Sequence, residues 1–127
     1  MKGRLSLSSF VIALTLLWLM GGCATLGRPP ITWQREDAAG HELTLVDPRY
    51  VESYRLQANG LAMVTIGEKG ESFAAPVMYW RIKDGRLVIS EDEDARSEFR
   101  RFTLLEKRAG EVSVCTKWGS RKVFKIR

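Results

Sequence analysis

The residues of this 127-residue chain that could perform chemistry are few and lie far apart in the sequence. His41 is the only histidine, and neither Cys115 nor any serine stands at a local spacing that would make a nucleophile–base pair with it. The acidic run at residues 91–94 lacks the glycine and the distal glutamate of a calcium-binding loop. No glycine-rich phosphate-binding loop follows a predicted strand. We therefore predict a protein without catalytic residues, bound metal or cofactor.

The other cysteine, Cys23, stands where a different chemistry is expected. It follows an uncharged, mainly apolar run, Leu5–Met20, which is preceded by the basic residues Lys2 and Arg4. A basic head, an apolar segment and small residues at the exit are the layout of a secretory signal. The uninterrupted apolar segment, residues 10–20, is only about half of the roughly 20 residues that a helix needs to cross a bilayer. The pattern therefore favours a cleaved signal over a permanent transmembrane helix.

The residues at the end of this run resemble the lipobox of bacterial lipoproteins. In Met20-Gly21-Gly22-Cys23, small side chains precede a thiol, which as its thiolate is the nucleophile a lipid donor can load. The resemblance implies that residues 1–22 are a signal peptide cleaved between Gly22 and Cys23. It also implies that Cys23 carries covalent diacylglycerol and an N-acyl chain. Because Ala24 follows the cysteine, the resemblance implies an outer-membrane location, with the domain facing the periplasm.

The chain that remains after such cleavage is long enough for one small domain. Residues 23–127 are 105 residues with 18 basic and 15 acidic side chains, a net charge of about +3. This mild basicity does not indicate a nucleic-acid partner. Residues 23–31 form a predicted tether that contains Gly27 and Pro29-Pro30 and reaches about 20 to 25 Å. The domain, residues 32–127, is therefore expected to sit close to the membrane.

Cys115 has no intramolecular partner if Cys23 is acylated. We expect it to be a small buried apolar side chain in a strand, since Val112, Val114 and Phe124 form an apolar set near it in the sequence. An intermolecular disulfide or a reactive thiol are the alternatives.

The strongest structural signal is the Asp-Gly dipeptide at residues 84–85, which is typical of a two-residue hairpin turn. This turn would pair Ile82 with Leu87 and Trp80 with Ile89, all on one face of the sheet. The opposite face is mostly polar, as a sheet with one wet side requires.

Three further segments complete the predicted strands. The Asn-Gly dipeptide at residues 59–60 predicts a second hairpin that pairs Leu56 with Met63. Residues 41–46 alternate as a strand, and Asp47 could cap a short helix that follows it. Two-residue turns at 109–110 and 119–120 would put one set of residues on a common face: Phe102, Leu104, Cys115, Phe124 and Ile126. Hairpins at this spacing predict an all-β fold, a small antiparallel meander barrel or half-barrel of about seven or eight strands.

Over roughly residues 50–106 the sequence also resembles a known family of domains. Y-R-L-Q-A-N-G, then V-M-Y-W-R-I-K-D-G-R-L-V-I-S, then R-F-T-L-L-E-K is similar in order to the small lipocalin-like domains of bacterial envelope lipoproteins. The G-x-W motif of true lipocalins is absent, because Ile31-Thr32 precede Trp33. The resemblance implies a β-barrel and does not imply a ligand-carrying interior.

These observations predict a membrane-anchored envelope lipoprotein that acts as a non-catalytic binding or interaction module. Its partners would be the membrane, through the lipid anchor, and an envelope protein. Two alternatives stay open: a carrier of a small apolar ligand inside the barrel, which eight strands can hold, and an inhibitor of a cell-wall-degrading enzyme. The candidate contact residues are aromatic: Trp33, Tyr54, Tyr79, Trp80 and Trp118. Of these, Trp80 is expected in the core, whereas Trp33 and Trp118 are expected at a barrel mouth or interface.

Basic residues are frequent in the last third of the chain. The set is Arg100, Arg101, Lys107, Arg108, Lys117, Arg121, Lys122, Lys125 and Arg127. A solvated outer face is the expected role. Contact with anionic lipid headgroups or with a cell-wall polymer is the functional alternative.

Overall fold

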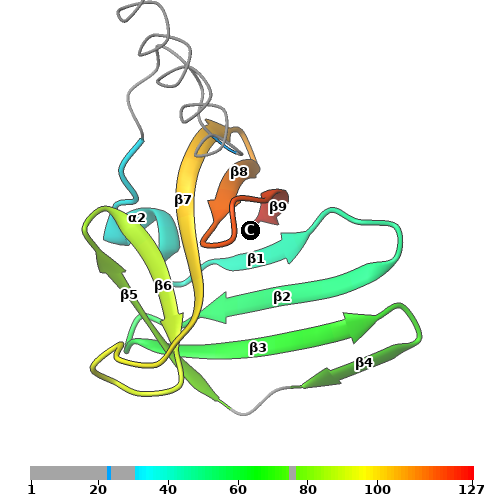
Figure 1. Ribbon diagram of the computed structural model, residues 1–127, viewed down its shortest axis with the longest axis horizontal. Coiled ribbons are helices and arrows are strands. Elements are labelled where there is room, and N and C mark those ends of the chain that lie inside the picture. The colour runs from blue at the N-terminus through cyan, green and yellow to red at the C-terminus, as the bar shows by residue number, and fades with distance from the viewer. Residues whose placement is uncertain (1–22, 24–30, 75–76) are drawn as a thin grey trace, which may run out of the picture.

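The computed structural model describes residue 23, residues 31–74 and residues 77–127, so the predicted signal peptide and most of the tether lie outside the described residues. One short helix precedes a series of strands (Figure 1). The elements are α2 Arg35–Ala38, β1 Glu42–Leu45, β2 Tyr50–Leu56, β3 Leu61–Glu68, β4 Glu71–Ala74, β5 Met78–Lys83, β6 Arg86–Ser90, β7 Glu98–Arg108, β8 Glu111–Thr116 and β9 Arg121–Ile126.

The strands form one closed antiparallel barrel. Its ring runs β1, β2, β3, β5, β6, β7, β8, β9 and back to β1, and every neighbouring pair is antiparallel. β4 stands outside the ring and pairs with the second half of β3, whereas β5 pairs with Leu61 and Ala62 at the start of β3. The all-β prediction of a small meander barrel is therefore confirmed, with eight strands in the ring.

The hairpin at residues 84–85 forms as predicted. Ile82 faces Leu87 and Trp80 faces Ile89. Both turn residues have positive φ angles, 52° at Asp84 and 74° at Gly85, as a type I′ turn requires.

The register predicted for the β2–β3 hairpin is wrong by one residue. Leu56 faces Ala62 rather than Met63, because the connection has three residues, 58–60, and only Gly60 has a positive φ, 90°. This is the three-residue hairpin in which a glycine occupies the left-handed position after a type I turn. Met63 consequently points outward and is 46% exposed.

The predicted face of Cys115 is also wrong. A bulge interrupts the β7–β8 pairing between Leu104 and Glu106, and the β8–β9 loop has three residues, 117–119, instead of the expected turn at 119–120. One extra residue shifts the register of β8 against β7, and the other shifts its register against β9, by one position each. A shift of one position exchanges the inward and outward faces of a strand. The buried, inward set of β8 is therefore Val112, Val114 and Thr116, and Cys115 lies on the outer wall.

The chain around Asp47 forms a turn and not the predicted helix. Asp47 Oδ1 accepts hydrogen bonds from the backbone amides of Arg49 and Tyr50, each at 2.8 Å, and Tyr50 already begins β2. An aspartate that binds the amide two residues later makes a turn of its own. The strand predicted at residues 41–46 is confirmed as β1.

The one described helix, α2, was not predicted, and it closes one end of the barrel. Trp33 donates its backbone amide to Gly85 at 2.9 Å, and Arg35 donates to Ala58 in the β2–β3 loop at 2.5 Å. Lys107 pairs with Asp37, so the segment contacts three hairpins at the same end. Figure 1 shows α2 beside the β5–β6 turn. We call this the closed end; the opposite end, where the loops at residues 46–49 and 117–120 border one cleft, is the open end.

Gly85 shows how tightly the closed end fits. A Cβ at this position would lie 2.8 Å from the Thr32 side chain, and the φ of Gly85 is positive. Both the turn and the close approach of the N-terminal segment therefore require glycine here.

Candidate binding site at the open end of the barrel

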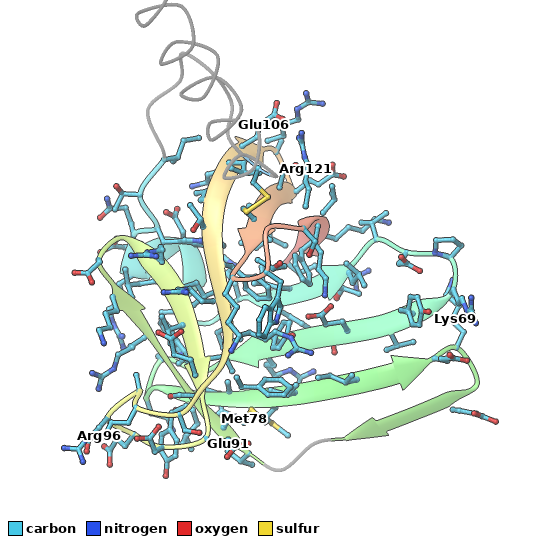
Figure 2. All side chains as sticks on the ribbon, in the orientation of Figure 1. Lys69, Met78, Glu91, Arg96, Glu106 and Arg121 are labelled. Atoms are coloured by element: carbon cyan, nitrogen blue, oxygen red, sulfur yellow. A yellow bond between two sulfur atoms is a disulfide. The ribbon has the colours of Figure 1, made fainter. Side chains whose placement is uncertain are left out.

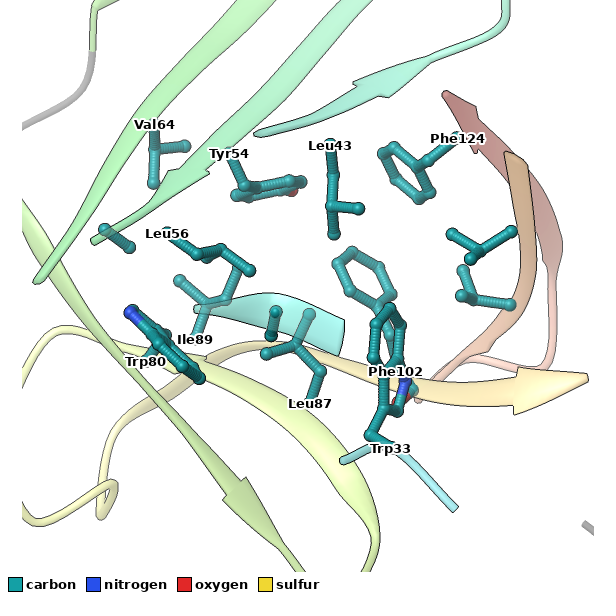
Figure 3. Close-up of a cluster of buried hydrophobic side chains, with 14 of the residues drawn as sticks. Trp33, Leu43, Tyr54, Leu56, Val64, Trp80, Leu87, Ile89, Phe102 and Phe124 are labelled. Atoms are coloured by element: carbon teal, nitrogen blue, oxygen red, sulfur yellow. The ribbon is translucent and has the colours of Figure 1, made fainter. Parts of the chain in front are cut away.

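Side chains occupy the interior of the barrel. Figure 3 shows these side chains pointing toward one another from strands around the ring. They include Trp33, Leu43, Tyr54, Leu56, Trp80, Leu87, Phe102 and Phe124, each at most 3% exposed. The rings of Tyr54, Phe102 and Phe124 pack against one another in edge-to-face and tilted arrangements, with centroids 5.2 to 6.0 Å apart. Apolar side chains thus take the space in which a carrier would hold its ligand.

Three of the five predicted contact residues are part of this interior. Trp80 lies in the core as expected, and Trp33 and Tyr54 are buried too. The expectation of Trp33 at a barrel mouth or interface is therefore wrong, and none of the three side chains offers a contact on the outside of the barrel. Trp33 donates its indole N–H to the Phe102 carbonyl at 3.1 Å, and Trp80 donates to the Gln57 carbonyl at 2.7 Å. Both indoles are thereby satisfied within the domain.

Tyr79 and Trp118 differ from those three. Tyr79 is half-buried on the outer face of β5. Trp118 is 83% exposed at the tip of the β8–β9 loop, more than any other large hydrophobic side chain in the described part of the chain. Trp118 is therefore the predicted contact residue that the structure leaves free to bind.

Charged side chains point inward at the open end. Glu52 on β2 is 5% exposed. It binds Lys122 of β9 at 2.6 Å and Arg100 of β7 at 3.4 Å, and it accepts a hydrogen bond from the Tyr54 hydroxyl below it. Three strands thus place an acid and two bases at the top of the apolar core. A buried carboxylate requires such partners, because an unpaired one would carry a large desolvation cost.

Burial raises the pKa of Tyr54, and the neighbouring Glu52 carboxylate raises it further. The phenol therefore stays protonated and donates to Glu52 at every physiological pH. Within the cluster, Tyr54 and Glu52 bond to each other, whereas Arg100 and Lys122 each have 29% of the side chain exposed. These two cations are therefore the groups of the cluster that face solvent. The cluster presents positive charge outward.

A cleft of about 470 Å³ opens above this cluster. Its lining combines Glu52, Arg100 and Lys122 with apolar side chains that include Leu45 and Ile66. Two further lining residues, Val46 and Tyr50, are 48% and 47% exposed. Apolar walls with a few convergent charged groups are the usual composition of a binding site. The arrangement fits a partner that has both an anionic group and an apolar part.

The pattern that could have revealed this cluster is the alternation of β2. Glu52 has the same inward parity as Tyr54 and Leu56, so a strand assigned from the tyrosine and the leucine places a carboxylate inside the barrel. Its partners Arg100 and Lys122 are 48 and 70 residues away. No local spacing connects them, and we did not predict this cluster.

Cys115 has an intramolecular partner in the structure. It forms a disulfide with Cys23, with the two Cα atoms 5.8 Å apart, and Figure 2 shows this bond on the outer wall of the barrel at β8. The expectation of a lone, buried Cys115 is therefore contradicted. The physical reason is its outward direction, which leaves the sulfur accessible to Cys23 on the outside of the barrel. Cys23 Sγ also lies 3.0 Å from the Gly119 carbonyl of the β8–β9 loop.

The remaining chemical candidates have structural partners. His41 Nδ1 lies 2.9 Å from the Arg127 carbonyl at the closed end. The Asp92 carboxylate accepts the amides of Arg96 and Ser97 at 3.0 and 2.8 Å, and these bonds shape the loop and lower the pKa of Asp92. Within the described residues, no three histidine, cysteine or acidic side chains gather as a metal site.

Comparisons with protein-family models, with curated proteins and with solved structures gave no match. Among the described residues, no helix has both the length and the apolar character needed to span a bilayer. The candidate site at the open end therefore rests on the geometry of this chain alone.

Proposed function

We propose that this protein is a bacterial envelope lipoprotein, anchored to the outer membrane through lipid on Cys23, whose barrel is a non-catalytic binding module that uses its open end. The observation that carries the binding role is the contrast between the two ends. The interior is filled, and the closed end is covered by the N-terminal segment, with an outer hollow of about 670 Å³ beside α2. The cleft of about 470 Å³ at the open end instead leads to the inward-pointing charges of Glu52, Arg100 and Lys122 and has half-exposed apolar side chains at its rim.

Lipid and disulfide are mutually exclusive at Cys23, because one sulfur cannot form both a thioether and a disulfide. Lipid loading of a lipobox cysteine precedes cleavage and needs only the N-terminal segment at the membrane. The disulfide instead joins residues 92 positions apart and needs β8 to be in place. We propose that lipidation occurs first, and that the mature protein then holds Cys115 as a free thiol.

The anchor is tested by expressing the full chain in a bacterium and measuring the intact mass of the protein extracted from membranes. We expect a chain that begins at Cys23, carries diacylglycerol and an N-acyl chain, and has one thiol that alkylates after unfolding without reductant. An unacylated chain in which neither cysteine alkylates until it is reduced would exclude the anchor.

The binding role of the open end is tested separately with a photo-crosslinking amino acid. Placed at Tyr50 in living cells, it should give a discrete adduct, whereas the same probe at Lys83, exposed beside the closed end, should give none. The adduct mass distinguishes the classes of partner: an envelope protein, a cell-wall-degrading enzyme among them, or a small amphiphile. Equal yields of the same adduct at both ends would contradict the proposal.

An apolar carrier that uses the interior receives less support from the packing. Tyr54, Phe102 and Phe124 would have to move to admit a ligand, and each is fully buried. A native mass equal to that of the bare acylated chain is therefore expected after gentle purification.

A further inference from the structure

The β8–β9 loop carries a cationic hollow next to its exposed tryptophan. The hollow measures about 160 Å³, and of the described residues that line it none is acidic: Arg100, Arg101, Thr116, Lys117, Trp118, Ser120 and Lys122. Lys117 Nζ lies 5.3 Å from the Trp118 ring centroid. Four cations and an amphipathic ring therefore border one depression at the open end.

Nearby carboxylates neutralise only part of this charge. Glu52 pairs with both Arg100 and Lys122, and Glu98 lies 3.7 Å from Arg101. Lys117 donates to the Glu98 backbone carbonyl, which is uncharged. The hollow thus keeps a net positive charge, which suits phosphate groups and attracts an anionic lipid surface.

The exposed apolar residues of the same end suit the boundary between headgroups and acyl chains. Trp118 is 83% exposed, and Tyr50 and Val46 are close to half exposed. Tryptophan and tyrosine are enriched at membrane interfaces, because their rings are apolar at one edge and polar at the other. Basic side chains beside them reach the lipid phosphates.

The short tether keeps the barrel close to a membrane. The contact of Cys23 with the β8–β9 loop belongs to the disulfide-bonded form, which lipid on Cys23 excludes, so in the lipidated protein the length of the tether sets the position of the anchor. The other end of the tether, Ile31, pairs with Leu104 on β7, and the residues between can span only about 25 Å. The anchor therefore keeps the barrel near the bilayer, and the cationic hollow and the exposed Trp118 favour the open end as the side that faces it.

We propose that the open end faces the membrane that holds the anchor, with Trp118 at the depth of the headgroups and Arg101, Lys117 and Lys122 against anionic phospholipid. This inference rests on the proposed lipid anchor at Cys23. It names the partner of the open end as an anionic lipid surface.

The test uses the mature lipidated protein in vesicles of phosphatidylglycerol and phosphatidylcholine in which some acyl chains are brominated. Bromine quenches nearby tryptophan, and the other tryptophans of the mature chain, Trp33 and Trp80, are buried. We expect quenching of the tryptophan emission, loss of that quenching in Trp118→Phe, and weaker quenching in vesicles of phosphatidylcholine alone.

Two matched double variants separate local charge from net charge. Arg101→Gln with Lys117→Gln should lower the quenching in phosphatidylglycerol vesicles to the level seen in phosphatidylcholine. Lys83→Gln with Lys125→Gln removes the same charge from exposed positions outside the hollow and should leave the quenching unchanged. Equal effects of the two double variants would overturn a specific role for the hollow.

The outcomes separate this inference from the proposed function. A mass without acyl chains would overturn the anchor and the orientation together. An acylated protein that stays in the vesicles, but whose emission is quenched equally in the parent and in Trp118→Phe, would overturn the orientation alone. A protein partner at the open end would then replace the lipid surface, and the crosslink from Tyr50 would identify it.

Discussion

The two ends of the barrel handle polar groups in opposite ways. At the closed end, the N-terminal segment pairs with strand ends and turns through backbone and side-chain hydrogen bonds, as between Trp33 and Gly85 and between Gly40 and Leu56. At the open end, charged side chains point inward, and Glu52, Arg100 and Lys122 hold one another above the core. One end is completed by the chain itself, and the other is left with charge and apolar surface toward solvent.

This contrast indicates how stability and binding are distributed. Replacing a buried ion pair with apolar residues is often neutral or stabilising, so the inward charges at the open end are a weak contribution to stability. The closed end instead buries a whole tryptophan and satisfies its N–H. We expect substitutions at the closed end to affect folding and substitutions at the open end to affect binding.

The largest expected effect compares the tryptophans of the two ends. Trp33→Ala should lower the free energy of unfolding by about 3–5 kcal/mol, because it removes a fully buried side chain and its bond to Phe102. Trp118→Ala should change it by less than about 0.5 kcal/mol, because Trp118 is 83% exposed. Urea unfolding of the purified mature chain measures both. Similar losses at the two positions would contradict the division between the ends.

The next effect concerns the outer wall beside the open end. In an unacylated chain, reducing the Cys23–Cys115 disulfide should lower the free energy of unfolding by about 2–4 kcal/mol, because the bond closes a long loop in the unfolded state. In the acylated protein the same reductant should have no effect. Unfolding curves with and without reductant test this, and a reductant-sensitive acylated protein would show that Cys115 has found another partner.

A smaller effect is expected within the open end. Glu52→Gln keeps the shape of the side chain but leaves Arg100 and Lys122 without a counter-charge, and should cost about 2 kcal/mol, since the two cations are partly solvated. Glu42→Gln is the matched control: its partner Arg55 is 65% exposed, so the loss should stay below about 0.5 kcal/mol. Equal losses in urea unfolding would mean that burial of Glu52 does not matter.

Parts of this barrel could be predicted from local sequence, and parts depended on distant residues. The Asp84-Gly85 hairpin has the predicted register because both turn residues adopt the positive φ that their types favour. The β2–β3 register is shifted by one, since an Asn-Gly pair also fits a three-residue loop in which only the glycine has positive φ. Sequence composition does not distinguish these two loops.

The candidate site was harder to predict for the same reason. A bulge between Leu104 and Glu106 and a three-residue loop after Thr116 together moved Cys115 to the outer wall. The Glu52 cluster joins strands that are neighbours only after the barrel has formed. The exposure of Trp118 could be predicted more easily, because its place between a lysine and a glycine indicates a loop tip, which needs no distant partner.

The smallest expected effect is a pH dependence at the closed end. The Lys107 ammonium that binds Asp37 holds the pKa of this carboxyl below its ordinary value of 3.8, and the backbone amide of Gln34 contributes in the same direction against the effect of burial. Because the folded state prefers the charged carboxylate, this contribution is present above the ordinary pKa and is lost as the pH falls through the lower, folded-state value. At neutral pH, Asp37→Asn should cost less than about 1 kcal/mol, because Lys107 is half exposed.

Urea unfolding at neutral pH and in acid measures this contribution. The difference in the free energy of unfolding between the parent and Asp37→Asn should shrink in acid. In a Lys107→Met background, most of this difference should be absent at neutral pH as well. The Asp47 carboxyl at the open end provides the comparison: the backbone amides of Tyr50 and Arg49 lower its pKa, so its contribution should be unaffected by Lys107→Met. If Lys107→Met instead changed the pH dependence of an Asp47→Asn variant as strongly as that of Asp37→Asn, the two ends would be coupled. The separation of folding at one end from binding at the other would then fail.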